Sequence, residues 1–204
     1  MDMKPYPEYK DSGVAWLGDV PRHWKVCRIK NHIQETDNRS IKGEEILLSM
    51  TRNKGIIRYS DRTDKPPSAK SLIGYKICHA NQIVMNRMQA WSGMFHTANE
   101  TGIISPDYAI FNAKFEDNIH FLCYLFRSPV MIEQFSIESK GIGSGFNRLY
   151  TEKLGSIYIA LPNQLEQSKM GDFIKFKTAQ IARFIKAKKR MIELLKEQKQ
   201  VIIN

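Results

Sequence analysis

Residues 163–204 read NQLEQSKMGDFIKFKTAQIARFIKAKKRMIELLKEQKQVIIN. Apolar residues occupy most positions of a seam that advances in alternating steps of four and three; these residues are Ile174, Ile181, Ile185, Ile192, Leu195 and Ile202. The remaining seam positions are Thr178, Lys188 and Lys199. No proline follows Pro162 and no glycine follows Gly171. The pattern therefore predicts one long helix with a coiled-coil-type face.

The start of this helix carries its own signal. Asn163, directly after a proline and three residues before Glu166, is typical of a helix cap in which side chain and backbone bond reciprocally. At about 1.5 Å per residue the helix would run on the order of 60 Å. A domain of this size offers an apolar face of only roughly 25–30 Å. We therefore favour a partner helix over the alternative, an amphipathic helix folded back on its own domain.

Charge is concentrated on the same helix. From residue 173 onward there are nine Lys or Arg and two Glu, a net of +7 against +10 for the whole chain. Residues 1–172 therefore carry only +3. Such a run is usually a solvated face, but it can also follow a phosphate backbone. With a pI of about 9.5, the chain is expected to bind an acidic polymer, with nucleic acid the leading candidate.

Composition is that of an ordinary globular protein, with 42% hydrophobic and 25% charged residues. No run approaches the roughly 18 apolar residues of a membrane span, and the polar, proline-containing start is unlike a signal peptide. Cys27, Cys78 and Cys123 are odd in number and lack metal-type spacing, so they are interpreted as buried, reduced thiols. We expect a cytoplasmic protein without a membrane partner.

The pattern before the helix is mixed and predicts an α+β domain over residues 1–161, followed by a spacer and dimerisation helix over 162–204. Strands are predicted at 45–50, 55–59, 82–88, 94–98, 108–115 and 157–161. Helices are predicted at 118–126 and 129–137, with a short turn at 151–154. Trp16, Leu17 and Trp24 are expected to fasten the N-terminal arm onto this domain, because aromatic side chains bury a large area.

Three polar loops are candidates for DNA contacts: residues 49–54, residues 86–93, which lead to His96, and residues 140–148. Planar bidentate groups such as Arg, Gln and Asn can read base edges, whereas Lys and Ser suit phosphates. Any one of these polar residues is more typical of a surface residue without a binding role. The hypothesis of a DNA-binding surface therefore rests on the three loops taken together. The candidates are Arg52, Lys54, Arg87, Gln89, Trp91, Ser92, His96, Lys140, Ser144, Asn147 and Arg148.

Catalytic motifs are missing from the sequence. Residues 105–108, Ser-Pro-Asp-Tyr, only faintly resemble the Asn/Asp-Pro-Pro-Tyr box of amino-methyltransferases, and no glycine-rich cofactor turn precedes them. The histidines show no HxxxH or HExxH spacing, and there is no phosphate loop or nucleophile elbow. No catalytic residue, metal or cofactor is predicted.

Three stretches carry a family resemblance. Residues 10–26 contain Lys-Asp-Ser-Gly, then Trp-Leu-Gly, then Pro-Arg-His-Trp. Residues 102–108 read Gly-Ile-Ile-Ser-Pro-Asp-Tyr, and residues 161–167 read Leu-Pro-Asn-Gln-Leu-Glu-Gln. In this order they resemble the target-recognition domain and conserved helix of the specificity subunits of type I restriction–modification systems. The resemblance covers nearly the whole chain and equals half of such a subunit.

The resemblance implies a function and partners. Full-length relatives carry two recognition domains separated by two antiparallel helices that act as a ruler between half-sites. Their partners are double-stranded DNA, a methyltransferase subunit that supplies S-adenosylmethionine chemistry, and an ATP-driven restriction subunit. The chain would be a non-catalytic specificity subunit, forming a homodimer through antiparallel helices. The alternative is a free-standing DNA-binding regulator, or a decoy that sequesters the other subunits.

Overall fold

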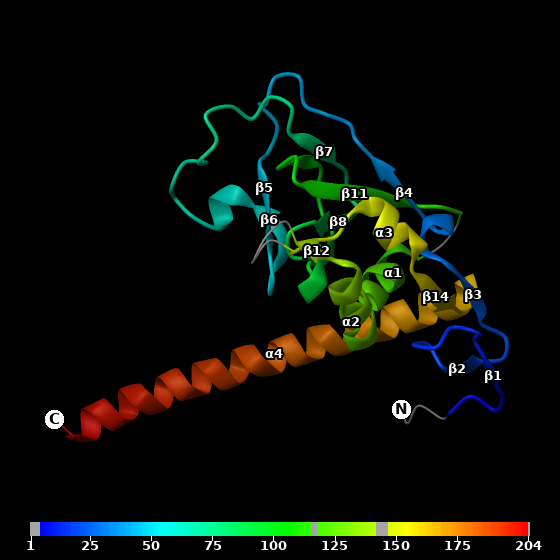
Figure 1. The fold of residues 1–204 in the computed structure, drawn as a ribbon. Helices are drawn as coiled ribbons and strands as arrows, with labels where there is room; N and C mark the ends of the chain where they lie inside the picture. Colours follow the sequence, from blue (N-terminus) through cyan, green and yellow to red (C-terminus); the bar gives the residue numbers. More distant parts are fainter. Residues whose placement is uncertain (1–4, 116–117, 142–146, 204) are drawn as a thin grey trace.

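The computed structural model describes residues 5–115, 118–141 and 147–203. A mixed domain is followed by one long helix, α4 (Gln164–Ile203), which projects well beyond it (Figure 1). The predicted α+β class and the predicted long helix are confirmed. Every side chain from residue 175 to residue 202 is exposed, so the interpretation in which the helix folds back on its own domain is wrong.

A four-stranded antiparallel sheet forms the centre of the domain, in the order β4-β11-β8-β9. Five two-stranded pairs surround it: β1-β2, β3-β14, β5-β6, β7-β10 and β12-β13. The strands of the sheet are β4 (Ile33–Thr36), β8 (Ile83–Asn86), β9 (Phe95–Thr97) and β11 (Tyr108–Ala113). The others are β1 (Tyr9–Asp11), β2 (Asp19–Pro21), β3 (Lys25–Arg28), β5 (Leu48–Thr51), β6 (Gly55–Arg58), β7 (Lys76–Cys78), β10 (Gly102–Ile104), β12 (Lys140–Gly141), β13 (Asn147–Arg148) and β14 (Tyr158–Leu161).

The two central strands are buried on both faces. In β8, Ile83 and Met85 join one hydrophobic cluster while Val84 between them joins a second cluster. β11 divides in the same way, with Phe111 in the first cluster and Ile110 in the second. Since successive strand residues point to opposite faces, the sheet separates two cores. For the strand predicted at 82–88, the sequence indicated alternation with one apolar face. It did not indicate that Val84, on the other face, belongs to a second core.

Three helices complete the first core. They are α1 (Ile119–Phe126), α2 (Pro129–Glu138) and α3 (Thr151–Ser156). The side chains of Asn118 and Ser128 cap α1 and α2 by accepting the backbone N–H of the third residue on, as short polar caps do. Phe126 and Phe135 pack on Phe95 of the sheet, with ring centroids 5.5 and 5.0 Å away. These contacts fix the helices to one face of the sheet.

The second core lies under the β5-β6 hairpin and the β7-β10 pair, on the opposite face. Gly102 shows why the chain has no side chain there: a Cβ would lie 2.4 Å from the carbonyl oxygen of Ile46. Ile103 and Ile104 after it are fully buried, and a turn then closes with the Tyr108 N–H donating to the Ser105 carbonyl. The stretch 102–108 is thus a buried strand and a tight turn, in agreement with its interpretation as a structural element.

The first turn of α4 joins the helix to the domain. The Asn163 side chain accepts the Glu166 N–H at 3.0 Å, which confirms the cap. Gln167, only 2% exposed, accepts the Asn118 N–H at 3.1 Å and donates to the Pro162 carbonyl at 3.1 Å. The reciprocal half of the predicted cap is wrong, because the Glu166 carboxylate points elsewhere.

Glu166 holds the N-terminal arm instead. Its carboxylate accepts from the Tyr6 hydroxyl, lies 2.8 Å from His23 Nε2 and accepts from the Trp24 indole at 3.3 Å. Burial opposes ionisation, but these hydrogen bonds outweigh it and lower the pKa of Glu166. Burial and the neighbouring carboxylate raise the pKa of Tyr6 to about 12. The expected fastening of the arm is therefore borne out, with Trp24 on Glu166 and Trp16 packed against the first core.

The three cysteines differ in exposure. Cys78 and Cys123 are buried, and burial raises the pKa of both thiols to about 11. Cys27 is half-buried, with its sulfur 3.0 Å from His32 Nε2, so its interpretation as a buried thiol is wrong. The physical reason is that β3 pairs only with β14, which leaves the other edge of this two-stranded sheet uncovered.

We predict that Glu166→Gln lowers the free energy of unfolding by about 2 kcal/mol at neutral pH, because hydrogen bonds to a charged group are lost. A lowered folded-state pKa stabilises the fold above the unfolded pKa of about 4.3, and this contribution disappears as the pH falls through the folded pKa. Urea unfolding as a function of pH should show the difference shrinking below about pH 4. Glu133→Gln, an exposed control, should show no such trend; equal behaviour of the two variants would contradict the assignment.

Candidate nucleic-acid interface

The described parts of the three predicted loops, which leave out residues 142–146, are in contact with one another. Arg52, in the turn of the β5-β6 hairpin, donates to the Ser92 carbonyl at 3.3 Å and to its hydroxyl at 3.0 Å. The Leu149 N–H, just after β13, donates to the Arg87 carbonyl at 3.0 Å. The second loop is therefore bonded to the first loop and to the residue that follows the third. The sequence placed these loops far apart along the chain, and the sheet brings them together.

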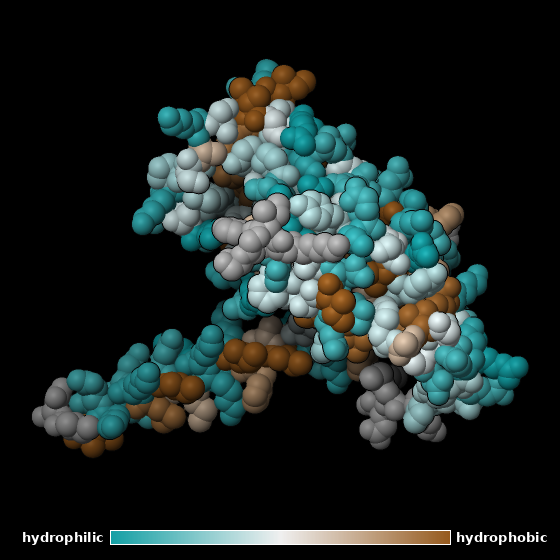
Figure 2. All heavy atoms as spheres, in the orientation of Figure 1, coloured by the Kyte–Doolittle hydropathy of each residue, from teal (hydrophilic) through white to brown (hydrophobic). Residues whose placement is uncertain are grey.

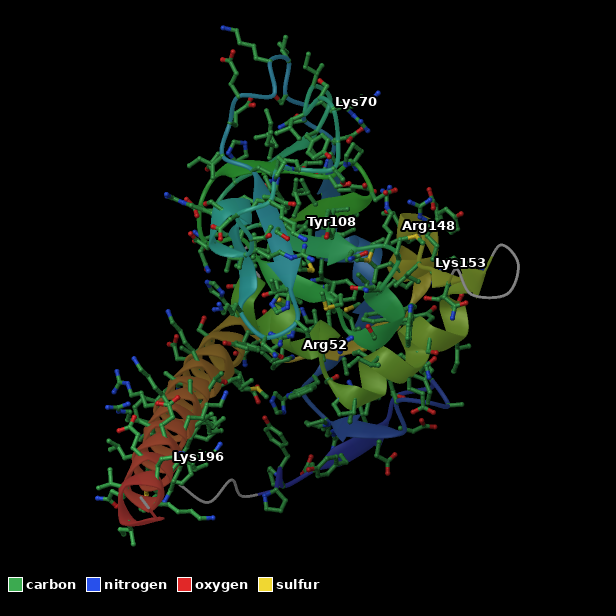
Figure 3. The ribbon with its side chains drawn as sticks, turned by 90° about the vertical axis from the view of Figure 1, so that its left-hand side faces the viewer. Arg52, Lys70, Tyr108, Arg148, Lys153 and Lys196 are labelled. Carbon is green, nitrogen blue, oxygen red and sulfur yellow. The ribbon has the colours of Figure 1, made fainter. Side chains whose placement is uncertain are left out.

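Five of the described candidate side chains are open to solvent: Arg52, Lys54, Gln89, Trp91 and Asn147. Trp91 is 41% exposed and donates its indole N–H to the Met88 carbonyl at 3.0 Å, so its ring is held by a short 3-10 turn. Figure 3 looks onto the side of the domain from which α4 projects, with Arg52 below Tyr108. Groups that can bind bases and groups that can bind phosphates are both present.

Arg87 is occupied by a carboxylate. Its guanidinium lies 2.5 Å from Glu35 of β4, and its side chain is only 23% exposed. Glu35 also accepts from Thr151 at 2.6 Å and lies 3.4 Å from the ammonium of Lys76, which is 3% exposed. Lys76 has a second partner in Asp37, at 3.1 Å. The network ties β4, β7 and α3 to the second loop and holds Arg87 in place.

Arg148 is held in the same manner. Its guanidinium lies 2.5 Å from Asp107, in the turn before β11, and its side chain is 30% exposed. Asn147 beside it is exposed. In the described part of the chain, the Nε atoms of Arg87 and Arg148 are buried without a hydrogen-bond partner. Sequence reasoning missed Glu35 and Asp107, because pairs separated by 52 and 41 residues leave no local pattern.

The other candidates lie differently. His96 of β9 is buried beneath the hairpin, where a Cβ on Gly55 would be 3.3 Å from its Nδ1. Burial, together with the charge of Arg127, lowers the pKa of His96 to about 4, so the ring is neutral. Lys140 belongs to β12, paired with Arg148 of β13. Ser144 lies outside the described residues.

Within the described ranges, no group of three or more His, Cys, Asp or Glu side chains is placed to hold a metal ion. None of the helices in that part of the chain is both long and apolar enough to cross a membrane. The arrangement is that of a binding surface built on paired strands and turns.

Comparison with solved structures places this fold. A chain from work on complex assembly and conformational transition of the type I restriction–modification (R-M) system matches with a TM-score of 0.64 at 19% identity, over 91% of this chain. The HsdS subunit from Thermoanaerobacter tengcongensis and the type I S subunit from M. genitalium both match with a TM-score of 0.53 at 14% identity. They cover 85% and 78% of this chain.

These matches span less than half of the other proteins, with 46%, 41% and 40% of their chains covered. No protein-family model matches the sequence, and no curated protein matches it in sequence. The protein therefore has a mixed domain and a long helix arranged as in these solved structures. Specifically, it is the fold of type I restriction–modification S subunits, and the resemblance seen in the sequence is confirmed at this level.

The structure also explains why the motifs of that resemblance occur together. Trp24, from the first motif, donates to Glu166 of the third motif. Asp107, from the second motif, holds Arg148 in the third candidate loop. The first and third motifs thus connect the N-terminal arm to α4. The second motif holds a residue of the third candidate loop in place.

We predict that Glu35→Gln destabilises the domain by about 3–5 kcal/mol, because Arg87 and the buried Lys76 lose a shared counter-charge. The midpoint of urea unfolding measures this change. The control is Glu100→Gln, which breaks a surface ion pair with Arg58 and should have a much smaller effect because solvent screens it. If the two midpoints move equally, the Glu35 network is no more important than a surface pair.

Proposed function

We propose that this chain is the sequence-reading component of a type I restriction–modification system and recognises one half of a bipartite DNA target. The observation that carries the proposal is the fold match over 91% of the chain, combined with two polar loops that are bonded to each other and a third whose described residues lie next to them. The chain would act on cytoplasmic DNA and supply no chemistry of its own. Methylation and cleavage would come from a methyltransferase subunit and a restriction subunit that bind the same chain.

The geometry suggests how the contacts divide. Arg52, Gln89 and Asn147 would read base edges, because their planar groups are exposed and can form two hydrogen bonds. Lys54 and Ser92 would bind phosphates, and Lys140 remains a candidate for the same role. Arg87 and Arg148 would act mainly as supports, since carboxylates already hold them. His96 would support the hairpin from beneath rather than meet DNA.

The exposed face of α4 supports a second part of the proposal, a homodimer. Ile181, Ile185, Ile192 and Leu195 are 47–57% exposed, and Ile202 is 84% exposed. Ile174 is half-buried near the domain. Figure 2 shows apolar atoms along α4 outside the domain. A stripe of this length is unusual for a monomer, and a second copy of α4 offers a face of the same length.

The apolar stripe on α4 is wider than a seven-residue repeat predicts. It also follows a second period, of eleven residues. Residues 173–177, Phe-Ile-Lys-Phe-Lys, return eleven residues later as Phe-Ile-Lys-Ala-Lys. Phe184 and Met191 are 63% and 52% exposed and lie on one flank of the stripe. An eleven-residue repeat has about 3.67 residues per turn and favours a nearly straight or slightly right-handed pairing. We propose antiparallel packing, with one recognition domain at each end and a two-fold target between them.

DNA affinity should fall with salt, at roughly 0.9 per phosphate contact on a double logarithmic plot, because bound lysines and arginines displace counterions. We predict that Gln89→Ala loses about 1–3 kcal/mol on the preferred sequence and little on others. Lys54→Ala should weaken all sequences alike and reduce the salt slope by about one. Fluorescence anisotropy over a panel of duplexes measures both effects.

The control for these two variants is Lys10→Ala, which removes an exposed lysine on β1, away from the three loops. It should change neither affinity nor slope. Indistinguishable profiles for Gln89→Ala and Lys54→Ala would refute the division into base and phosphate contacts. Salt-independent binding would refute the electrostatic part of the proposal.

We predict a dimer in light scattering, and a folded monomer for the double variant Ile185→Asp, Ile192→Asp. Two charges inside the paired stripe would be buried without partners, whereas the domain cores do not involve these residues. The control, Ala179→Asp, adds a charge on the side of the helix opposite the stripe and should stay dimeric. A native chain that remains monomeric at high micromolar concentration would contradict the homodimer.

A further inference from the structure

A small cavity opens between β5, the loop that follows β6 and the turn before β11. Its volume is about 140 Å³. Three tyrosines, Tyr59, Tyr75 and Tyr108, line it together with Arg62 and Ser49. A cavity of about 150 Å³ is enough for one benzene ring. The space therefore matches a single six-membered ring rather than a fused pair of rings.

The wall combines ring faces with a polar edge. The Arg62 guanidinium donates to the Ser49 hydroxyl at 2.8 Å and keeps further N–H groups for another acceptor. Among the described residues, the hydroxyls of Tyr75, Tyr108 and Ser105 have no hydrogen-bond partner. Burial raises the pKa of Tyr108, which keeps its phenol protonated and able to donate. Aromatic faces for stacking and unsatisfied polar groups for the ring edge occur together here.

The cavity adjoins the candidate interface. Tyr108 pairs in register with Asn86, the residue directly before Arg87. Asp107, its other neighbour, holds Arg148. In Figure 3, Tyr108 lies above Arg52, with Arg148 beside it. DNA bound across the three loops would pass next to this opening.

We propose that this cavity, the tyrosine pocket, takes one unstacked pyrimidine base of the bound DNA. The inference rests on the proposed DNA-binding function. A flipped base is recognised by stacking between aromatic or apolar side chains and by hydrogen bonds to its edge, which is the chemistry of this wall. A phosphate would need several cationic or backbone N–H donors, whereas one arginine and three aromatic rings line the cavity. The size of the cavity favours a pyrimidine over a purine.

The test uses the full chain and short duplexes that differ only at one position. One duplex is fully paired, one carries a bulged thymidine, one a bulged adenosine, and one an abasic residue in place of the bulged nucleotide. The thymidine bulge should bind about tenfold more tightly than the abasic bulge, since one stacked base contributes on this order. The adenosine bulge should gain less, because its two rings exceed the cavity.

Variants separate the pocket from the general affinity for DNA. Tyr75→Ala and Tyr108→Phe should reduce the preference for the thymidine bulge and leave the affinity for paired DNA unchanged. Tyr158→Phe, an exposed tyrosine that stacks on Arg28 far from the cavity, is the matched control and should keep the preference. Thermal unfolding of each variant shows whether the fold is retained.

Equal binding of the thymidine and abasic bulges by the native chain would overturn the pocket. So would an Arg62→Met variant that weakens every duplex alike, because the site would then bind phosphate. If paired DNA binds with the expected salt dependence and no bulge is preferred, only this inference fails. If no duplex binds at all, the proposed function fails and the pocket with it.

Discussion

The pairing of β8 with β11 is the constraint on which the rest of the structure depends. Both strands are buried on both faces, so the helices must cover one face while the β5-β6 hairpin and the β7-β10 pair cover the other. The ends of these two strands also carry the candidate interface. β8 leads directly into Arg87, and β11 begins at Tyr108. The register between β8 and β11 therefore fixes the position of the second loop and of the cavity beside it.

Carboxylates tune how much positive charge this surface presents. Glu35 and Asp107 hold two arginines close to the domain, and both arginines keep a buried Nε without a partner among the described atoms. The open groups, by contrast, lie at the tips of turns, where they can adapt to a ligand. Most of the excess charge is carried by α4, which packs on the domain only through its first turns. Under the proposed function, the domain would contact DNA and the helix would span the distance to a second domain.

Local signals predicted the elements well. The cap at Asn163, the Ser128-Pro129 start of α2 and the apolar stretches of β8 and β11 each act over a few residues, and each was visible in the sequence. Predictions that required a partner far along the chain were incomplete. The carboxylate of Glu166 was expected to bond its own helix start, but it binds Tyr6, His23 and Trp24 instead. His96 was predicted to contact DNA from the strand that follows the second loop, and it lies buried beneath Gly55.

The sequence alone determined the helix, its exposed stripe, the mixed domain before it and the three polar loops, because periodicity, caps and turn residues are properties of neighbouring positions. Only the tertiary structure decided which loop residues are open and which are held. Glu35 reaches Arg87 across the sheet, and Tyr59, Tyr75 and Tyr108 meet around one cavity from three separate segments. Such contacts depend on strand register and on packing across the two cores, which no local pattern encodes.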